Sequence, residues 1–168
     1  IYGAFSSGIM LYGLSILFGL TGTTKFFEMQ NAISSLGSDS NLALILSVVF
    51  IMVGFGYKIS AVPFHFWTPD VYEGSPTSIT AYLSVAPKAA GFALIIRFFN
   101  IAFGSNSAMG SDEWSSLNSL PWPFLIALLS AATMTIGNLV AIQQQSVKRM
   151  LAYSSIAHAG YMICLLYT

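Results

Sequence analysis

The chain has 168 residues, of which 55% are hydrophobic and only 7% charged, and its mean hydropathy is +0.73. These values exclude an ordinary soluble domain and predict an integral membrane protein in contact with the lipid bilayer. Six basic residues balance six acidic ones, so the sequence has no basic surface of the kind that binds nucleic acid.

The first third of the chain holds two predicted membrane crossings. Residues 2–20 are an apolar run of about the length that spans a bilayer, with glycines at intervals common where helices pack closely. Residues 21–40 are polar and fit either a loop or a short interfacial helix. The second crossing lies within residues 41–66.

This second crossing contains both a charge and a helix breaker. Lys58 lies only about 7 Å from the middle of the apolar segment, too deep for a residue at a helix end. Pro63 lacks a backbone donor, which predicts a helix broken near Pro63, between Lys58 and His65. Broken membrane helices occur where backbone lines a cavity or a protein interior, and ion paths run there.

Residues 67–77, WTPDVYEGSPT, are predicted as a short turn. Its Asp70 and Glu73 either cap the next helix or gather protons at the mouth of a path. A later turn carries the adjacent bases Lys148 and Arg149, which favours the cytoplasmic or equivalent side for it. Alternation of the crossings then places residues 67–77 on that same side.

Three more crossings follow. The third spans about residues 78–100, with Lys88 near its centre and too far from either surface to reach it easily. After a polar loop at residues 101–120, the fourth crossing spans residues 121–143. A fifth begins near Met150. The sequence alone therefore predicts an all-α, polytopic transmembrane helix bundle of about five crossings.

The buried lysines are the candidate functional residues. A lysine amine in a low-dielectric interior loses hydration, which favours its neutral form and lets it exchange protons. If Lys58 and Lys88 lie about 10 Å apart, their repulsion at an effective dielectric of about 20 is about 1.7 kcal/mol, so a proton on one weakens proton binding by the other. The alternative is that each lysine only forms a structural ion pair with an acid outside this stretch.

Two histidines are weaker candidates. His65 follows Lys58 by seven residues, two turns along one face of a continuous helix, and imidazole relays protons near neutral pH. It is equally well read as an interfacial packing residue. His158, in SSIAHAGY, is read first as a hydrogen-bonding helix residue and second as a relay.

No motif for covalent or redox chemistry is present in the sequence. It has no Ser/His/Asp set, glycine-rich phosphate loop or ligand cluster for zinc, haem or iron–sulfur. Cys164 stands alone in an apolar run, which excludes an internal disulfide and indicates a small core side chain. The residues alone thus predict a membrane bundle with a lysine-centred path for protons or cations, without a cofactor in this chain.

Three stretches carry a resemblance to a known family: KISAVPFHFWTPDVYEGSPT, VAPKAAGFALIIRFF and GNLVAIQQQSVKRMLAYSSIAHAGY. In this order, over nearly the whole chain, they resemble the N-type antiporter-like membrane subunit of complex I, the NADH:quinone oxidoreductase. VPFHFWTPDVYEG is the most specific part, because related antiporter-like subunits carry a different version.

The resemblance implies a fold and a set of roles. The fold has fourteen crossings in two inverted repeats, each with a broken helix, and residues 1–168 would be an internal fragment holding the sixth to tenth. Lys58 would be the central lysine of the first half-channel and Lys88 the connecting lysine, with a partner glutamate before Ile1 and a second-half lysine after Thr168. Pro87 is a variation found in some members of the family.

The resemblance also implies partners and a location. NADH, FMN, iron–sulfur clusters and quinone would be bound by other subunits, and this chain would contact other membrane subunits of the complex. The location would be a bacterial inner membrane or an organellar energy-transducing membrane. Two alternatives stay open: a multi-subunit cation/proton antiporter without electron transfer, and a structural subunit whose lysines only pair with acids.

Overall fold

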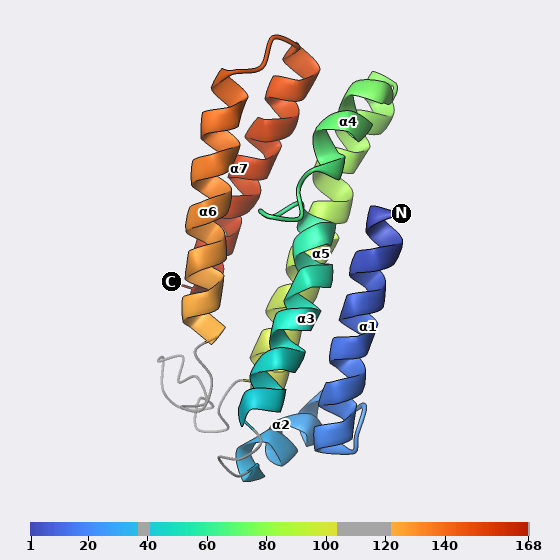
Figure 1. Cartoon of the computed structure of the whole chain (residues 1–168), viewed down its shortest axis with the longest axis vertical. Helices are drawn as coiled ribbons and strands as arrows, with labels where there is room; N and C mark the ends of the chain where they lie inside the picture. The colour runs from blue at the N-terminus through green and yellow to red at the C-terminus, as the bar shows by residue number, and fades with distance from the viewer. Residues whose placement is uncertain (37–40, 104–121, 168) are drawn as a thin grey trace.

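The computed structural model describes residues 1–36, 41–103 and 122–167, and every regular element in these ranges is an α-helix (Figure 1). The seven helices are α1 (Tyr2–Thr21), α2 (Phe26–Ser35), α3 (Asn41–Ile59), α4 (Trp67–Gly74), α5 (Thr77–Phe103), α6 (Trp122–Ile142) and α7 (Val147–Tyr167). The predicted polar loop at residues 101–120 lies outside the described residues, except that α5 continues to Phe103.

Four helices are long and apolar enough to cross a membrane: α1, α3, α5 and the Phe124–Ile142 part of α6. They correspond to the first four predicted crossings. The fifth corresponds to α7, whose 21 residues match the length of a span. It is less apolar because Lys148, Arg149 and several hydroxyl-bearing residues interrupt it, and it packs along α6.

The helix at the centre of the bundle is α3. In its most apolar window 44% of the residues are buried, against 17% for α1 and 22% for α5. It packs against α1 on one side and α5 on another, and contributes fully or nearly fully buried side chains such as Leu44, Val48 and Ile51 to the core. Of the four apolar spans, α3 is therefore the one most enclosed by the rest of the described chain.

The polar stretch after α1 contains the helix α2, which agrees with the expected short helix and not with a loop. Phe26 of α2 stacks edge-on against Phe98 of α5, with ring centroids 5.8 Å apart. Phe98 also contacts Phe55 of α3 and Phe99 and Phe103 of α5. This aromatic cluster joins α2, α3 and α5 at one end of the bundle.

The prediction of a turn at residues 67–77 was wrong, because Trp67–Gly74 form the helix α4. Pro69, which lies in the predicted turn, is the third residue of α4. A proline is tolerated in the first turn of a helix, where backbone amides have no partner within the helix. In Figure 1, α4 lies beyond the end of α3 and beside the first part of α5.

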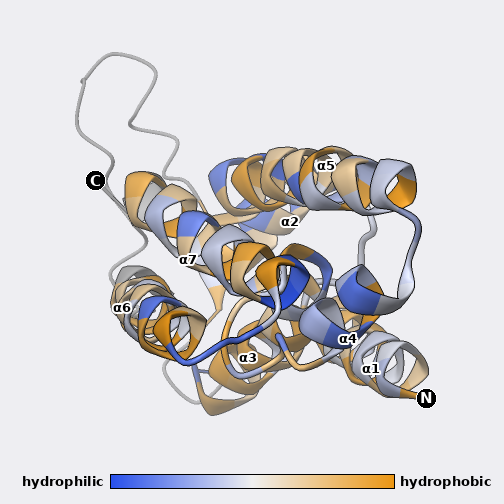
Figure 2. Ribbon diagram, turned by 90° about the horizontal axis from the view of Figure 1, so that it is seen from above, coloured by the Kyte–Doolittle hydropathy of each residue, from blue (hydrophilic) through white to orange (hydrophobic). Residues whose placement is uncertain are grey.

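Ion pairs tie α4 to the beginning of α7. Arg149 Nη2 donates to Asp70 Oδ1 at 3.0 Å and Nη1 to Glu73 Oε2 at 2.8 Å, while Lys148 Nζ donates to the Ser75 carbonyl at 3.0 Å. Figure 2 shows the hydrophilic parts of these two helices side by side. The two polar segments thus lie at the same end of the bundle, as predicted, and the acids pair with α7 instead of capping α5.

Gly13 allows α1 to approach α3 closely. A Cβ atom there would lie 2.8 Å from Phe50 Cβ and 2.9 Å from the Ser47 carbonyl oxygen, too close without a shift of α3. Gly8 on the same helix has no atom within 4 Å of such a position. Of these two α1 glycines, only Gly13 is therefore required for packing within the described chain.

We expect Gly13→Ala to lower the free energy of unfolding by about 1–3 kcal/mol, because one methyl group overfills the α1–α3 contact. Gly8→Ala is the matched control and should leave stability unchanged or slightly raised through helix propensity. Denaturant unfolding of the full-length protein in detergent measures both. Equal effects of the two substitutions would contradict the α1–α3 packing.

Candidate functional site

The break in the second crossing begins one residue after Lys58, where α3 ends. Ser60 has a positive φ of 62°, its amide donates to the Tyr57 carbonyl at 3.2 Å, and the Ala61 amide donates to the Gly56 carbonyl at 2.8 Å. This pair of bonds is the Schellman arrangement that closes a helix C-terminus. The predicted break between Lys58 and His65 is confirmed.

One side chain of α6 binds the backbone inside the break. The Val62 amide donates to Thr133 Oγ1 at 3.1 Å, and the Thr133 hydroxyl in turn donates to the Leu129 carbonyl at 2.6 Å. Because its proton is used by Leu129, the Thr133 oxygen is available as an acceptor. Val62 and Thr133 are both buried. The hydroxyl therefore provides the hydrogen bond that water would give to the Val62 amide at an exposed position.

The first turn of α4 binds the end of α3 from the other side. Trp67 Nε1 donates to the Tyr57 carbonyl at 3.1 Å, and the Thr68 hydroxyl donates to Ser60 Oγ at 2.7 Å. The Trp67 and Tyr57 rings also contact each other, with centroids 5.3 Å apart. The two halves of the broken helix are therefore joined by side chains and not only by the connecting backbone.

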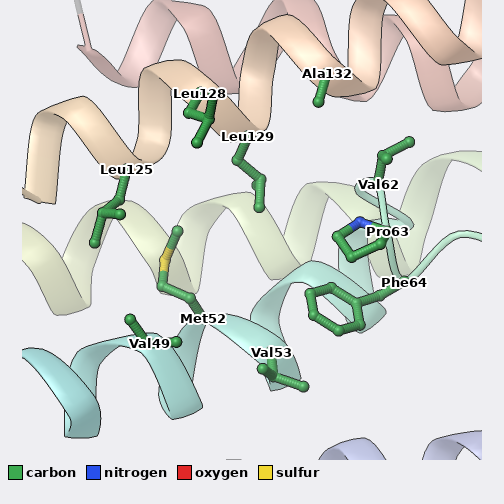
Figure 3. A pocket seen from close by; sticks show the side chains of 10 residues that line it. All are labelled: Val49, Met52, Val53, Val62, Pro63, Phe64, Leu125, Leu128, Leu129 and Ala132. Carbon is green, nitrogen blue, oxygen red and sulfur yellow. The ribbon is translucent and has the colours of Figure 1, made fainter.

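An apolar cavity of about 330 Å³ lies between α3, the break and α6. Figure 3 shows Met52 of α3 and Leu129 of α6 at opposite sides of it, with Pro63 and Phe64 at one end. All its lining residues are apolar, so it offers no side-chain acceptor for the Val62 amide. The Thr133 hydroxyl is consequently the polar contact that α6 supplies to the break.

Lys58 lies where α3 touches α5. A Cβ atom at Gly91 of α5 would lie 3.9 Å from Lys58 Cβ and 2.8 Å from Ile59 Cγ2, so the helices meet at a point that only glycine fits. Lys88 precedes Gly91 by three residues, about 4.5 Å along the axis of α5. The structure thus brings both lysines to one level of the α3–α5 contact, although the Lys58 side chain itself is exposed on the described chain.

Lys88 is buried, with 4% of its surface exposed. Its Nζ donates to the carbonyl oxygen and to the Oγ of Ser155 on α7, each at 2.9 Å. Both acceptors are neutral, and no carboxylate contacts Lys88 among the described residues. The amine is therefore oriented by hydrogen bonds without a fixed counter-charge from this part of the chain.

His65 is buried inside the break, 4% exposed, and does not share a helical face with Lys58 because α3 has already ended. Its ring stacks on Phe66 at a centroid distance of 4.4 Å and lies 6.2 Å from the Tyr153 ring of α7. Within the described residues, His65 Nδ1 has no hydrogen-bond partner. A buried imidazole nitrogen with a free position can accept or donate a proton.

A groove of about 390 Å³ runs between α4, α5 and α7. Lys148 lines it near the start of α7, and Ser155, which binds Lys88, lines it two turns further along, about 10 Å away. His158 also lines it and keeps the predicted local bond, with Nδ1 2.8 Å from the Ser154 carbonyl. The groove thus connects the Lys88 site with the charged end of the bundle.

Sequence reasoning missed the residues that hold these candidates in place. Ser155 and Thr133 are ordinary members of apolar helices, and serines and threonines occur along most of the chain, so neither carries a signal. No group of three or more His, Cys, Asp or Glu side chains that could bind a metal ion occurs in the part of the chain that the structure describes.

Comparison with known sequences gives a match over the whole chain. The family model described as "NADH:quinone oxidoreductase/Mrp antiporter, TM" matches residues 1–168. The chain is 50% identical, over 97% of its length, to NADH-quinone oxidoreductase subunit N of Anaeromyxobacter sp. strain Fw109-5, of which it covers 33%. It spans about a third of the length of the curated relatives that it matches.

Two solved structures share the fold. Respiratory complex I from Thermus thermophilus with bound aureothin contains a chain 36% identical to this one, with a TM-score of 0.75 over 99% of this chain and 32% of that chain. The Mrp complex from Dietzia sp. DQ12-45-1b contains one that is 20% identical, with a TM-score of 0.77 over 99% and 28%. The second likeness concerns the fold alone, and together they confirm the predicted antiporter-like helix bundle.

We expect Thr133→Val to lower the free energy of unfolding by about 1–3 kcal/mol, because the Val62 amide loses its buried acceptor. Thr133→Ser keeps the hydroxyl and should restore part of the loss. Thr135→Val is the matched control, since the exposed Thr135 hydroxyl bonds only to the Ala131 carbonyl of its own helix. Denaturant unfolding in detergent measures all three, and equal losses for Thr133→Val and Thr135→Val would contradict the role of Thr133.

Proposed function

The chain belongs to the NADH:quinone oxidoreductase/Mrp antiporter transmembrane family, and from this premise we propose that it is part of the proton-translocating subunit N of a complex I-type NADH:quinone oxidoreductase. The observation that carries this proposal is the identity of about 50% to proteins named NADH-quinone oxidoreductase subunit N, over 97% of the chain. The activity belongs to the whole subunit, of which this chain corresponds to about a third.

In the proposed mechanism, Lys88 and Lys58 carry protons. Lys88 is suited to the role because its amine is buried and held by two neutral acceptors, so either protonation state can persist without leaving an unpaired carboxylate. Lys58 lies at the same level of the α3–α5 contact. A proton on one lysine weakens proton binding by the other through charge repulsion. In this way charge passes from one lysine to the other without large backbone motion.

The C-terminus of α3 supports the role of Lys58. Carbonyl groups at the end of a helix carry a partial negative charge, which stabilises a nearby cation. Lys58 is in the last turn of α3, so the break both creates this charge and places it beside the lysine.

We assign His65 the role of relay between the lysines and the far side of the break. It is buried and oriented by Phe66 and Tyr153, and its Nδ1 is open to a proton-carrying partner within the described residues. The groove from Lys148 to Ser155 supplies a route toward Lys88 from the charged end of α7.

The whole complex supplies the driving reaction. NADH, FMN, iron–sulfur clusters and quinone are bound by partner subunits in this proposal, and quinone reduction there drives proton movement through this subunit. The partners are the other membrane subunits of the complex, and the location is an energy-transducing membrane, for a bacterial protein the inner membrane. The likeness to the Mrp complex is one of fold and does not favour cation/proton antiport over this function.

The test is NADH-driven proton uptake by inverted membrane vesicles that contain the full-length subunit in its complex. We expect Lys58→Ala and Lys88→Ala each to lower uptake about tenfold or more at equal amounts of assembled complex, because a proton carrier is removed. Lys25→Ala is the matched control, since exposed Lys25 pairs only with its neighbour Glu28 on α2.

Each alternative predicts a different result. If the parent shows no NADH-driven uptake but responds to a sodium or potassium gradient, the chain is part of an antiporter. If both lysine variants pump like the parent, the lysines are structural charges.

A further inference from the structure

Pro87 leaves the Leu83 carbonyl without its helical partner. In an α-helix the amide of each residue donates to the carbonyl four residues earlier, and proline has no amide hydrogen. Yet α5 runs from Thr77 to Phe103 with Pro87 inside it. A carbonyl freed in this way in a membrane helix requires a donor from another element.

Tyr72 of α4 supplies that donor. Its hydroxyl donates to the Leu83 carbonyl at 3.1 Å, and only 2% of Tyr72 is exposed. The Thr80 hydroxyl of α5 has two acceptors, the Tyr72 carbonyl and the Pro76 carbonyl, each at 3.2 Å. The two helices are therefore bound to each other by hydrogen bonds directly before the proline.

The same hydroxyl lies next to the Lys88 site. Tyr72 and Ser155 line the same groove, and Ser155 Oγ accepts from Lys88 Nζ at 2.9 Å. Because Lys88 follows Pro87 directly, the direction of its side chain depends on how α5 bends at the proline.

We propose that Tyr72 is a positioning residue for Lys88, and that by binding the carbonyl freed by Pro87 its hydroxyl sets the course of α5 that brings Lys88 Nζ to Ser155. This inference rests on the proposed function, in which Lys88 carries protons. Tyr72 and Pro87 act as a pair, since an ordinary residue at position 87 would bind the Leu83 carbonyl itself and make the hydroxyl unnecessary.

The pairing is tested with Tyr72→Phe, Pro87→Ala and the double variant of the full-length subunit in its complex. Tyr72→Phe should lower NADH-driven proton uptake at least about threefold at equal assembly, because a buried carbonyl loses its donor. In the Pro87→Ala background the same substitution should change uptake less than about twofold, because the backbone amide gained at position 87 replaces the hydroxyl. Tyr82→Phe, at an exposed tyrosine of α5, is the matched control and should have no effect.

A second readout separates positioning from general loss of structure. If Tyr72→Phe moves Lys88 away from Ser155, the ammonium loses its hydrogen bonds, and the high-pH limb of the uptake profile should shift to lower pH. The Pro87→Ala background should remove this shift. Equal losses of uptake in both backgrounds, or an unchanged profile, would overturn the proposal.

Thermal unfolding in detergent of the parent, Tyr72→Phe, Pro87→Ala and the double variant distinguishes the two proposals from each other. Tyr72→Phe should destabilise the parent more than it destabilises Pro87→Ala, whether or not the complex pumps protons. If this difference is present but the parent takes up no protons, the proposed function fails and the Tyr72–Leu83 contact stands. If the difference is absent while the parent pumps, the Tyr72 proposal fails alone.

Discussion

A peptide group that loses its helical partner in apolar surroundings must find another, because no water is there to take its place. This constraint arises twice close together in the chain, at the break after α3 and at Pro87 in α5. At the break, Thr133 and the first turn of α4 provide the partners. At Pro87, Tyr72 provides it. The positions of α4 and α6 beside α3 and α5 therefore depend on hydrogen bonds to these backbone groups as well as on apolar packing.

Both candidate proton carriers lie at these irregularities. Lys58 is the last residue but one of α3, and Lys88 is the residue after Pro87. A helix end or a proline site offers both polarity and a defined bend. The serine that binds Lys88 comes from α7, so the geometry of the amine depends on both α5 and α7. Through the proposed role of Tyr72, it depends on α4 as well.

The sequence was informative where one residue type forces a local outcome and silent where contacts span the chain. Apolar runs predicted the spans, and Pro63 predicted the break because a proline removes a helical hydrogen bond and crowds the preceding turn. The prediction of a turn at residues 67–77 was wrong because Pro69 lies in the first turn of α4, where a proline is tolerated. The sequence does not show that a helix begins at Trp67. Thr133, Ser155 and Arg149 act on partners more than 65 positions away, and a hydroxyl or guanidinium carries no sign of which partner the fold will give it.

The exposed side chain of Lys58 limits how the rest of the protein can be arranged. An ammonium group that faces acyl chains inside a bilayer is costly, and such residues face a protein interior or water instead. The side of α3 that bears Lys58 therefore faces protein or water and not lipid. About two thirds of the length of the curated relatives lies outside this chain. Under the proposed function, a helix from that part or from a neighbouring subunit covers Lys58.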